Sequence, residues 1–230
     1  DTAILIDAGI SRKRIVTGLR QQNIDPATVD AVFISHEHAD HCRGLKILSK
    51  YEGYPIYASA GTIERLQARC PKADLRPLFM ELSLKDLKIR SIPVPHDAAE
   101  PMGFVVENGS SRLVIATDMG YVTDRVLEEI ALCDALVFES NHDIQMLMDG
   151  PYPADLKQRI LSRWGHLSNT QCAAALKATC PPNLKLVMLA HLSKENNHPE
   201  LALETSCTCI GSDVKLVVAD RYSATGPFQF

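Results

Sequence analysis

Residues 36–41 constrain this chain most, because they place three histidines and an aspartate within six consecutive positions. They follow an apolar run, 31–34, that has the pattern of a buried strand. Imidazole and carboxylate groups are the ligands that zinc, manganese or iron accept. A turn at the end of this strand can direct its first two histidines to one cation and its aspartate and last histidine to another. The spacing predicts a dinuclear metal site rather than a solvated, histidine-rich turn.

Further residues of the same kind follow three other predicted strands. The apolar patterns at 87–94, 112–117 and 184–190 each run into a potential ligand. These ligands are His96, Asp118 and His191. One such residue after a strand is usually structural or solvated. Three of them, added to the loop at 36–41, predict a site shared by several strand ends.

With these residues in place, the chain resembles the metallo-β-lactamase-fold hydrolases. The pattern of that family is an Asp-bearing first strand, a His-x-His-x-Asp-His loop, and then a His, an Asp and a final His. Here the matching residues are Asp7, His36, His38, Asp40, His41, His96, Asp118 and His191, so the resemblance covers essentially the whole chain. It implies an α/β fold, the four-layer αβ/βα sandwich, formed by residues 1–230 as a single domain.

The resemblance also implies two divalent metal ions, Zn²⁺ or Mn²⁺ with iron as a further possibility. One ion would bind His36, His38 and His96, and the second would bind Asp40, His41 and His191, with Asp118 between the two. Asp7 and His142 would lie outside the ligand set. Asp7 would hold a ligand histidine in the right tautomer rather than bind metal.

Two features narrow the resemblance to nucleases of this superfamily. A strand predicted at 135–139 ends at Glu139, and His166 lies in a Gly-His-Leu-Ser-Asn segment before a helical run. In ribonuclease Z, a Glu and a His in similar places form a proton-donating pair, although Leu167 departs from the His-Ser-Thr pattern of that enzyme. The alternative for His166 is a histidine that caps a helix.

The YycJ/WalJ group of exonuclease-like proteins resembles the chain more closely. That group carries a Glu-(Ser/Ala)-Asn-His-Asp segment, a Gly-Pro-Tyr-Pro, a Gly-His-Leu-Ser-Asn and a His-Leu-Ser-x-x-Asn-Asn-x-Pro. The same segments stand here at 139–143, 150–153, 165–169 and 191–199. Members usually have an earlier strand, whereas this chain opens on Asp1 without a Met, so we expect its first strand to be truncated.

The chemistry expected of such a site is hydrolysis. Two cations about 3.5 to 4 Å apart acidify a water and neutralise charge that develops on an ester oxygen. Asp40 would orient or deprotonate the nucleophile. His166 would protonate the leaving oxygen of a phosphodiester, and Glu139 would keep that histidine cationic.

Composition agrees with an intracellular enzyme. The chain has 230 residues, 46% of them apolar, which is enough for one large core. Seven cysteines without a Cys-x-x-Cys pair argue against a disulfide framework, and Cys207 and Cys209 are interpreted as buried thiols. We find no apolar run of ~18 residues and no signal peptide. The expected location is therefore the cytoplasm.

Charge leaves the substrate less certain. A formal charge of −4 and a pI near 6.1 do not indicate a strongly basic nucleic-acid binder. Local basic patches can still line a path to the site, or can be ordinary solvated faces. They comprise Arg12, Lys13 and Arg14, then Lys157, Arg159 and Arg163, and also Lys194.

Together these patterns favour a metal-dependent phosphodiesterase, most simply a 5′-to-3′ DNA exonuclease, with DNA preferred over RNA. One alternative is a small-molecule hydrolase on the same fold, such as a cyclic phosphodiesterase, lactonase or β-lactamase. Another is a metal-binding module without catalysis, although such relatives generally lose ligands and none is missing here.

Helices and strands are predicted to alternate without a linker or repeat. Strands are expected at 3–7, 31–35, 55–58, 104–108, 112–116, 135–139, 184–190 and 214–219. Helices are expected at 11–21, 43–51, 61–69, 122–132, 154–163, 169–179 and 199–209. Asn108-Gly109 suits a tight hairpin turn between two of the strands.

Overall fold

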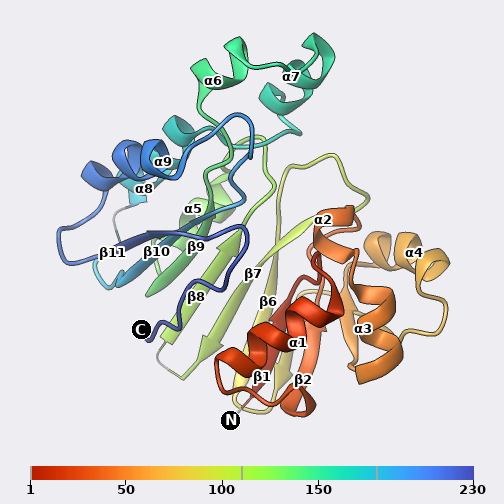
Figure 1. The fold of residues 1–230 in the computed structure, drawn as a ribbon. Helices are drawn as coiled ribbons and strands as arrows, with labels where there is room; N and C mark the ends of the chain where they lie inside the picture. Colours follow the sequence, from red (N-terminus) through yellow and green to blue (C-terminus); the bar gives the residue numbers. More distant parts are fainter. Residues whose placement is uncertain (1, 110, 180) are drawn as a thin grey trace. The chain divides into compact units, whose positions relative to one another are not determined.

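A computed structural model describes residues 2–109, 111–179 and 181–230. The chain divides into two compact units. The first contains the residues up to 93 together with 98–102, and the second contains 94–97 and 103–230. Figure 1 traces the elements of each unit along the chain. The expectation that residues 1–230 form one domain stays a prediction.

A parallel sheet forms the centre of the first unit. Its order is β1-β2-β3-β4. The unit also contains β5 and β6, which pair in antiparallel and are the last two strands of the seven-stranded sheet β11-β10-β9-β8-β7-β6-β5. These strands are β1 (Ala3–Ile6), β2 (Val29–Phe33), β3 (Ile56–Ala58), β4 (Leu75–Pro77), β5 (Glu81–Leu84) and β6 (Leu87–Pro93). The helices are α1 (Arg12–Gln21), α2 (Ala39–Cys42), α3 (Leu45–Glu52) and α4 (Ala60–Arg69), with a 3₁₀ turn at Pro26–Thr28.

Local sequence explains where these helices begin and end. The Ser11 hydroxyl accepts a hydrogen bond from the Arg14 amide at the start of α1, and Ser59 does the same for Thr62 at the start of α4. Such caps stabilise a helix by about 1 kcal/mol. Helix α3 ends at Gly53, which has the left-handed backbone typical of a helix terminus. The helices pack apolar side chains against the sheet, where Val32, Ile34, Leu45, Leu48, Ile56 and Leu66 are buried.

A second sheet organises the second unit. The strands of the sheet that belong to this unit follow the order β11-β10-β9-β8-β7, antiparallel between β7 and β8 and parallel elsewhere. They are β7 (Met102–Asn108), β8 (Ser111–Ala116), β9 (Ala135–Glu139), β10 (Leu186–Ala190) and β11 (Lys215–Val218). Strands β9 and β10 are buried along most of their length, which is why they are continuous apolar runs in the sequence.

Helices line this sheet and extend beyond it (Figure 1). Helices α8 and α9 contact each other, α5 contacts α8, and α9 contacts β11. The helices are α5 (Asp124–Ile130), α6 (Ile144–Asp149), α7 (Ala154–Leu161), α8 (Asn169–Thr179) and α9 (Pro199–Ser206), followed by a 3₁₀ turn at Cys207–Cys209. No helix of the described ranges has the length and the apolar stretch that a bilayer crossing requires.

Most predicted elements are present, with shifted ends. The strand at 135–139 and the helix at 169–179 have the predicted bounds. The helix predicted at 43–51 is wrong in its start: α2 ends at Cys42, and Gly44 separates it from α3. Strands β4 and β5 and helix α6 were not predicted, because segments this short carry little periodicity. Cys207 is exposed and Cys209 partly so, which corrects the expectation that both are buried.

Candidate metal centre

In the first unit, two parallel strands carry the candidate residues to one edge of the sheet. Ile6 of β1 pairs with Phe33 of β2, so both strands end side by side, and the Asp7 amide donates to the Phe33 carbonyl at 2.7 Å. Asp7 follows β1, and the loop with His36 and His38 follows β2. The backbone of Asp7 is left-handed, with φ of 61°, so the chain turns away within one residue of the strand.

Asp40 and His41 lie on the short helix α2, where only a turn was predicted. This helix packs against the chain that follows β1: the Ala8 amide donates to the His41 carbonyl at 2.7 Å. Gly9 allows the contact, since a Cβ there would lie 1.4 Å from the Asp40 carbonyl oxygen. The motif at 36–41 therefore combines an extended segment with one helical turn, which separates the directions of its ligands.

Asp7 organises this loop through both carboxylate oxygens. Oδ1 accepts a hydrogen bond from the Ser35 backbone amide at 2.8 Å. Oδ2 accepts two hydrogen bonds, from the Ser35 hydroxyl at 2.9 Å and from Nδ1 of His41 at 2.6 Å. The Ser35 oxygen lies 3.0 Å from Nδ1 of His36. A carboxylate only accepts, so Nδ1 of His41 carries the proton and Nε2 the lone pair. This contact is the one that the predicted orienting role of Asp7 requires.

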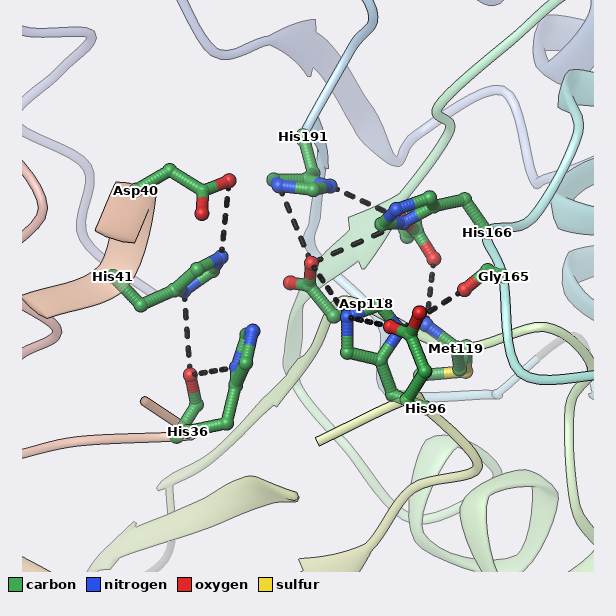
Figure 2. A network of polar contacts seen from close by, with 12 residues as sticks. His36, Asp40, His41, His96, Asp118, Met119, Gly165, His166 and His191 are labelled. Atoms are coloured by element: carbon green, nitrogen blue, oxygen red, sulfur yellow. Dashed lines mark hydrogen bonds and ion pairs between the residues drawn. The ribbon is translucent and has the colours of Figure 1, made fainter. Parts of the chain in front are cut away.

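The four candidate ligands of the first unit, His36, His38, Asp40 and His41, are called the first half-set below. The His36 ring centroid lies 4.6 Å from that of His38 and 4.2 Å from that of His41. Nε2 of His41 is 3.6 Å from Asp40 Oδ2 (Figure 2). His36 and His41 are buried, whereas the Asp40 side chain is 61% exposed. The half-set thus has a buried, rigid side and an accessible carboxylate.

In the second unit, three parallel strands end at one edge. Phe138 of β9 pairs with Ala116 of β8 and with Leu189 of β10, so their carboxyl ends are in register. Asp118, Glu139 and His191 stand at or just beyond these ends, which is where open α/β sheets place functional residues. Asp118 and His191 share the left-handed backbone of Asp7, with φ of 61° and 58°.

Glu139 connects the residues of this second edge. Its Oε1 accepts hydrogen bonds from Nδ1 of His166 at 2.7 Å and from Nδ1 of His191 at 3.1 Å. Its Oε2 accepts hydrogen bonds from the backbone amides of Met119 at 2.9 Å and Leu167 at 3.2 Å. Burial alone would raise the pKa of this fully buried carboxyl. The hydrogen bonds from the two histidines outweigh burial, so the pKa lies below its ordinary value and Glu139 is a carboxylate.

His96 has the same kind of fixed orientation. Its Nδ1 donates to the Gly165 carbonyl at 3.1 Å, so the lone pair is on Nε2, which lies 3.9 Å from Asp118 Oδ1. Burial lowers the pKa of His96, which favours the neutral imidazole that metals bind. Its ring centroid is 5.0 Å from that of His166. The second half-set, as named below, comprises His96, Asp118, Glu139, His166 and His191.

The donor groups of the second half-set fit a divalent cation. Asp118, Glu139, His166 and His191 each offer a ligand atom, and these atoms all lie within 4.8 Å of one another. Nε2 of His191 is 3.3 Å from Asp118 Oδ1, while its Nδ1 faces Glu139. Imidazoles whose other nitrogen is held by a carboxylate or carbonyl are the usual protein ligands of zinc and its neighbours. The same feature marks His41 and His96.

Three of the groups that hold these side chains were not predicted from the sequence. Ser35 contacts both Asp7 and His36, and the Gly165 carbonyl orients His96. The side-chain amide of Asn141 donates a hydrogen bond to the His191 carbonyl at 2.8 Å. Ser35 directly precedes the histidine loop, and Asn141 is part of a matched family segment, so the roles of both could have been predicted from their places in the sequence.

His142, predicted to support a ligand, is placed differently. It is buried, and within the described part of the chain neither ring nitrogen has a hydrogen-bond partner. Burial lowers its pKa to about 4. Its role in the site stays a prediction, and its neighbour Asn141 is the residue that contacts His191.

Comparison with known proteins decides the family. A family described as "Beta-lactamase superfamily domain" matches residues 2–191. The chain belongs to this superfamily. Among solved structures, the metallo-β-lactamase fold protein YhfI of Bacillus subtilis aligns with a TM-score of 0.71 at 20% identity, over 98% of this chain and 87% of that one. The predicted fold class, the metallo-β-lactamase fold, is confirmed.

Curated members of the superfamily are more similar in sequence. Exodeoxyribonuclease YycJ of Bacillus anthracis is 39% identical over 205 residues, which span 86% of this chain and 77% of that protein. Exodeoxyribonuclease WalJ of Streptococcus pneumoniae is 36% identical over 206 residues, with the same coverage. The resemblance to the YycJ/WalJ group is confirmed, and the chain is a metal-dependent hydrolase.

Proposed function

We propose that this chain is a dinuclear metal-dependent phosphodiesterase that degrades DNA from its ends in the 5′-to-3′ direction. The observation that carries the proposal is the similarity to two exodeoxyribonucleases over 86% of the chain. The contacts of Glu139 and His166 support it, because cleavage of a phosphodiester needs a proton donor for the leaving oxygen.

The proposed ligands come from both half-sets, by the family pattern. One ion would bind His36, His38 and His96, and a second would bind Asp40, His41 and His191, with Asp118 shared. When bound, the two cations supply positive charge that polarises the phosphodiester and makes a water more acidic. We propose that these ions are Zn²⁺ or Mn²⁺.

The protein groups supply the proton transfers. Nδ1 of His166 is held by Glu139 at 2.7 Å, so the proton for the leaving oxygen is carried on Nε2. The same hydrogen bond to the Glu139 carboxylate fixes the orientation of the His166 ring. Asp40, which is exposed, would accept a proton from the attacking water.

The test uses purified protein with added Mn²⁺ or Zn²⁺. Substrates are DNA and RNA labelled at either end, together with bis(p-nitrophenyl) phosphate. The proposal expects stepwise release of nucleotides from the 5′ end of DNA and slower cleavage of RNA. Release from the 3′ end would reverse the polarity. Hydrolysis of the p-nitrophenyl ester without cleavage of either nucleic acid would contradict the nuclease assignment.

A small-molecule hydrolase is the second candidate, and the formal charge of −4 is the observation that favours it. Steering of a polyanion by the net field of the protein is weak at this charge. The same experiment separates the two, with a cyclic nucleotide, a lactone and a β-lactam added as substrates. A kcat/KM for one of these far above that for DNA would support the small-molecule function.

A further inference from the structure

An exposed aromatic residue stands next to the second half-set. Trp164 is the only tryptophan in the chain, and it is 58% exposed. It lies between α7 and α8, two residues before His166. Large aromatic surfaces that stay in water beside a candidate site are typical contacts for a ligand with a flat apolar face.

Hydrogen bonds hold the backbone of Trp164 in place. The Trp164 carbonyl accepts the Asp97 amide at 3.1 Å, and the Trp164 amide donates to the Ser162 hydroxyl at 3.2 Å. The next residue must be glycine, because a Cβ at Gly165 would lie 2.1 Å from the Ile160 carbonyl oxygen. Since the Gly165 carbonyl also accepts a hydrogen bond from His96, one short segment fixes the backbone of Trp164, orients a proposed ligand and carries the proposed proton donor.

Cations are frequent in the segment that carries Trp164. Residues 154–166 contain three cations and a single carboxylate, Asp155. The Arg163 guanidinium lies 4.7 Å from the ring centroid of Tyr121. Arg159 pairs with Asp97, and Lys157 donates to the Met148 carbonyl at 2.6 Å.

We call Tyr121, Arg163 and Trp164 the aromatic edge. An exposed indole next in sequence to an arginine that stacks on a tyrosine matches a ligand that is both flat and anionic. Single-stranded nucleic acid has that chemistry, because its bases stack on aromatic rings and its phosphates contact arginine. A purely apolar partner would not need the neighbouring cations.

We infer that Trp164 stacks against an unpaired base of the substrate, and that Arg163 contacts an adjacent phosphate. The inference rests on the proposed function and specifies its substrate: the base next to the scissile phosphate is held outside a duplex. Single-stranded or frayed ends should bind more tightly than blunt ends. A single base–aromatic stack typically changes binding by roughly 5- to 150-fold on substitution by alanine.

Because Trp164 is the only tryptophan, its fluorescence reports the contact directly. The protein is titrated with a single-stranded oligonucleotide in EDTA, so that nothing is hydrolysed. Quenching of the indole emission is expected, and fluorescence anisotropy of labelled DNA should show a Kd raised roughly 5- to 150-fold in Trp164→Ala. Trp164→Phe should retain much of the affinity. Phe79→Ala is the matched control, since Phe79 is an exposed aromatic residue of the first unit, and its Kd should not change.

A substrate change completes the test. Oligonucleotides with an abasic site at the terminal nucleotide should bind the wild type more weakly, yet should bind Trp164→Ala as tightly as intact DNA does. In cleavage assays the variant should raise KM far more than it lowers kcat. An unchanged Kd in Trp164→Ala would overturn the inference, and so would additive effects of the abasic site and the substitution. If the wild type cleaves DNA in that case, the proposed function survives; if it neither binds nor cleaves DNA, both fail.

Discussion

The first half-set lies within six consecutive residues, whereas the second is drawn from five separate segments of the chain. Both are built in the same way: a carboxylate at the end of a strand accepts hydrogen bonds from histidine Nδ1 atoms and from backbone amides. Asp7 does this for His41, and Glu139 does it for His166 and His191. In the first half-set every histidine so held is a proposed ligand. In the second, one carboxylate serves a proposed ligand and the proposed acid.

This difference teaches that the two carboxylates should respond differently to substitution. Asp7 is partly exposed, with 20% of its side chain in water, while Glu139 is fully buried. A change at Asp7 should alter metal binding alone. A change at Glu139 should alter metal binding and proton transfer together, because the same oxygen accepts from both histidines.

The largest expected effect is removal of metal. Chelation should reduce hydrolysis to the uncatalysed level, because both half-sets act through the cations. Elemental analysis of the reconstituted protein should give two divalent ions per chain. His36→Ala should empty the site of the first ion, whereas His191→Ala should weaken binding of the second. No more than a trace of metal in the reconstituted wild type would contradict the dinuclear site.

Replacing the proposed acid should have the next largest effect. His166→Ala should slow DNA cleavage by ~10² to 10⁴-fold while keeping both metals. Hydrolysis of bis(p-nitrophenyl) phosphate should suffer much less, because p-nitrophenolate leaves without protonation. Steady-state kinetics on both substrates, with metal content measured in parallel, check this. Equal losses on the two substrates would indicate a positioning role, and loss of metal would make His166 a ligand.

The two organising carboxylates allow a direct comparison. Asp7→Asn should weaken metal binding by ~10- to 100-fold, the usual effect of losing such a partner. Its kinetic loss should be the same for good and poor leaving groups once metal is saturating. Glu139→Gln should weaken metal binding as well, through His191. In addition, it should slow the cleavage of DNA more than the hydrolysis of the p-nitrophenyl ester. Metal titrations followed by kinetics measure both quantities. If the two variants lost rate in the same proportion on good and poor leaving groups, the two half-sets would not differ in the way proposed here.

The smallest effect concerns stability and the buried His142. Burial lowers its pKa to about 4 from 6.5, so the folded protein keeps the ring neutral while the unfolded chain takes up a proton. The folded state therefore loses stability as pH falls from about 6.5 towards 4, and is insensitive to this group above that range. His142→Leu should remove this loss.

Urea unfolding in EDTA measures the effect. Between pH 7.5 and pH 5, wild type should lose about 2 kcal/mol more unfolding free energy than His142→Leu. Parallel curves for wild type and His142→Leu would show that His142 is not a buried neutral base.

The two half-sets differ in how far they can be predicted from the sequence, for a physical reason. Residues 36–41 are adjacent, so their spacing alone predicted a metal site. Glu139 and His166 are 27 positions apart and were paired only through a family resemblance; the structure places them 2.7 Å apart. Contacts between distant segments depend on strand register, which the sequence does not display.

Other details depended on backbone geometry. The turn predicted for Asp40 and His41 is a helix, because the segment packs on the chain after β1 and closes an intrahelical turn there. The bond from Glu139 to His191 was not predicted, since it follows from the pairing of Glu139 with Ala190 in the sheet. Short elements such as α6 and β5 lacked enough periodicity to be found.

The left-handed backbone at Asp7, Asp118 and His191 limits how this site can be redesigned. A residue with a Cβ in that conformation is disfavoured by roughly 1–2 kcal/mol, while glycine is not and asparagine is the best tolerated of the rest. Alanine or a β-branched residue at these positions would therefore change the folding free energy as well as the chemistry. Libraries for directed evolution should contain more folded members when asparagine and glycine replace these three residues, and Asp118→Asn is the substitution that removes a charge with the least disturbance of the chain.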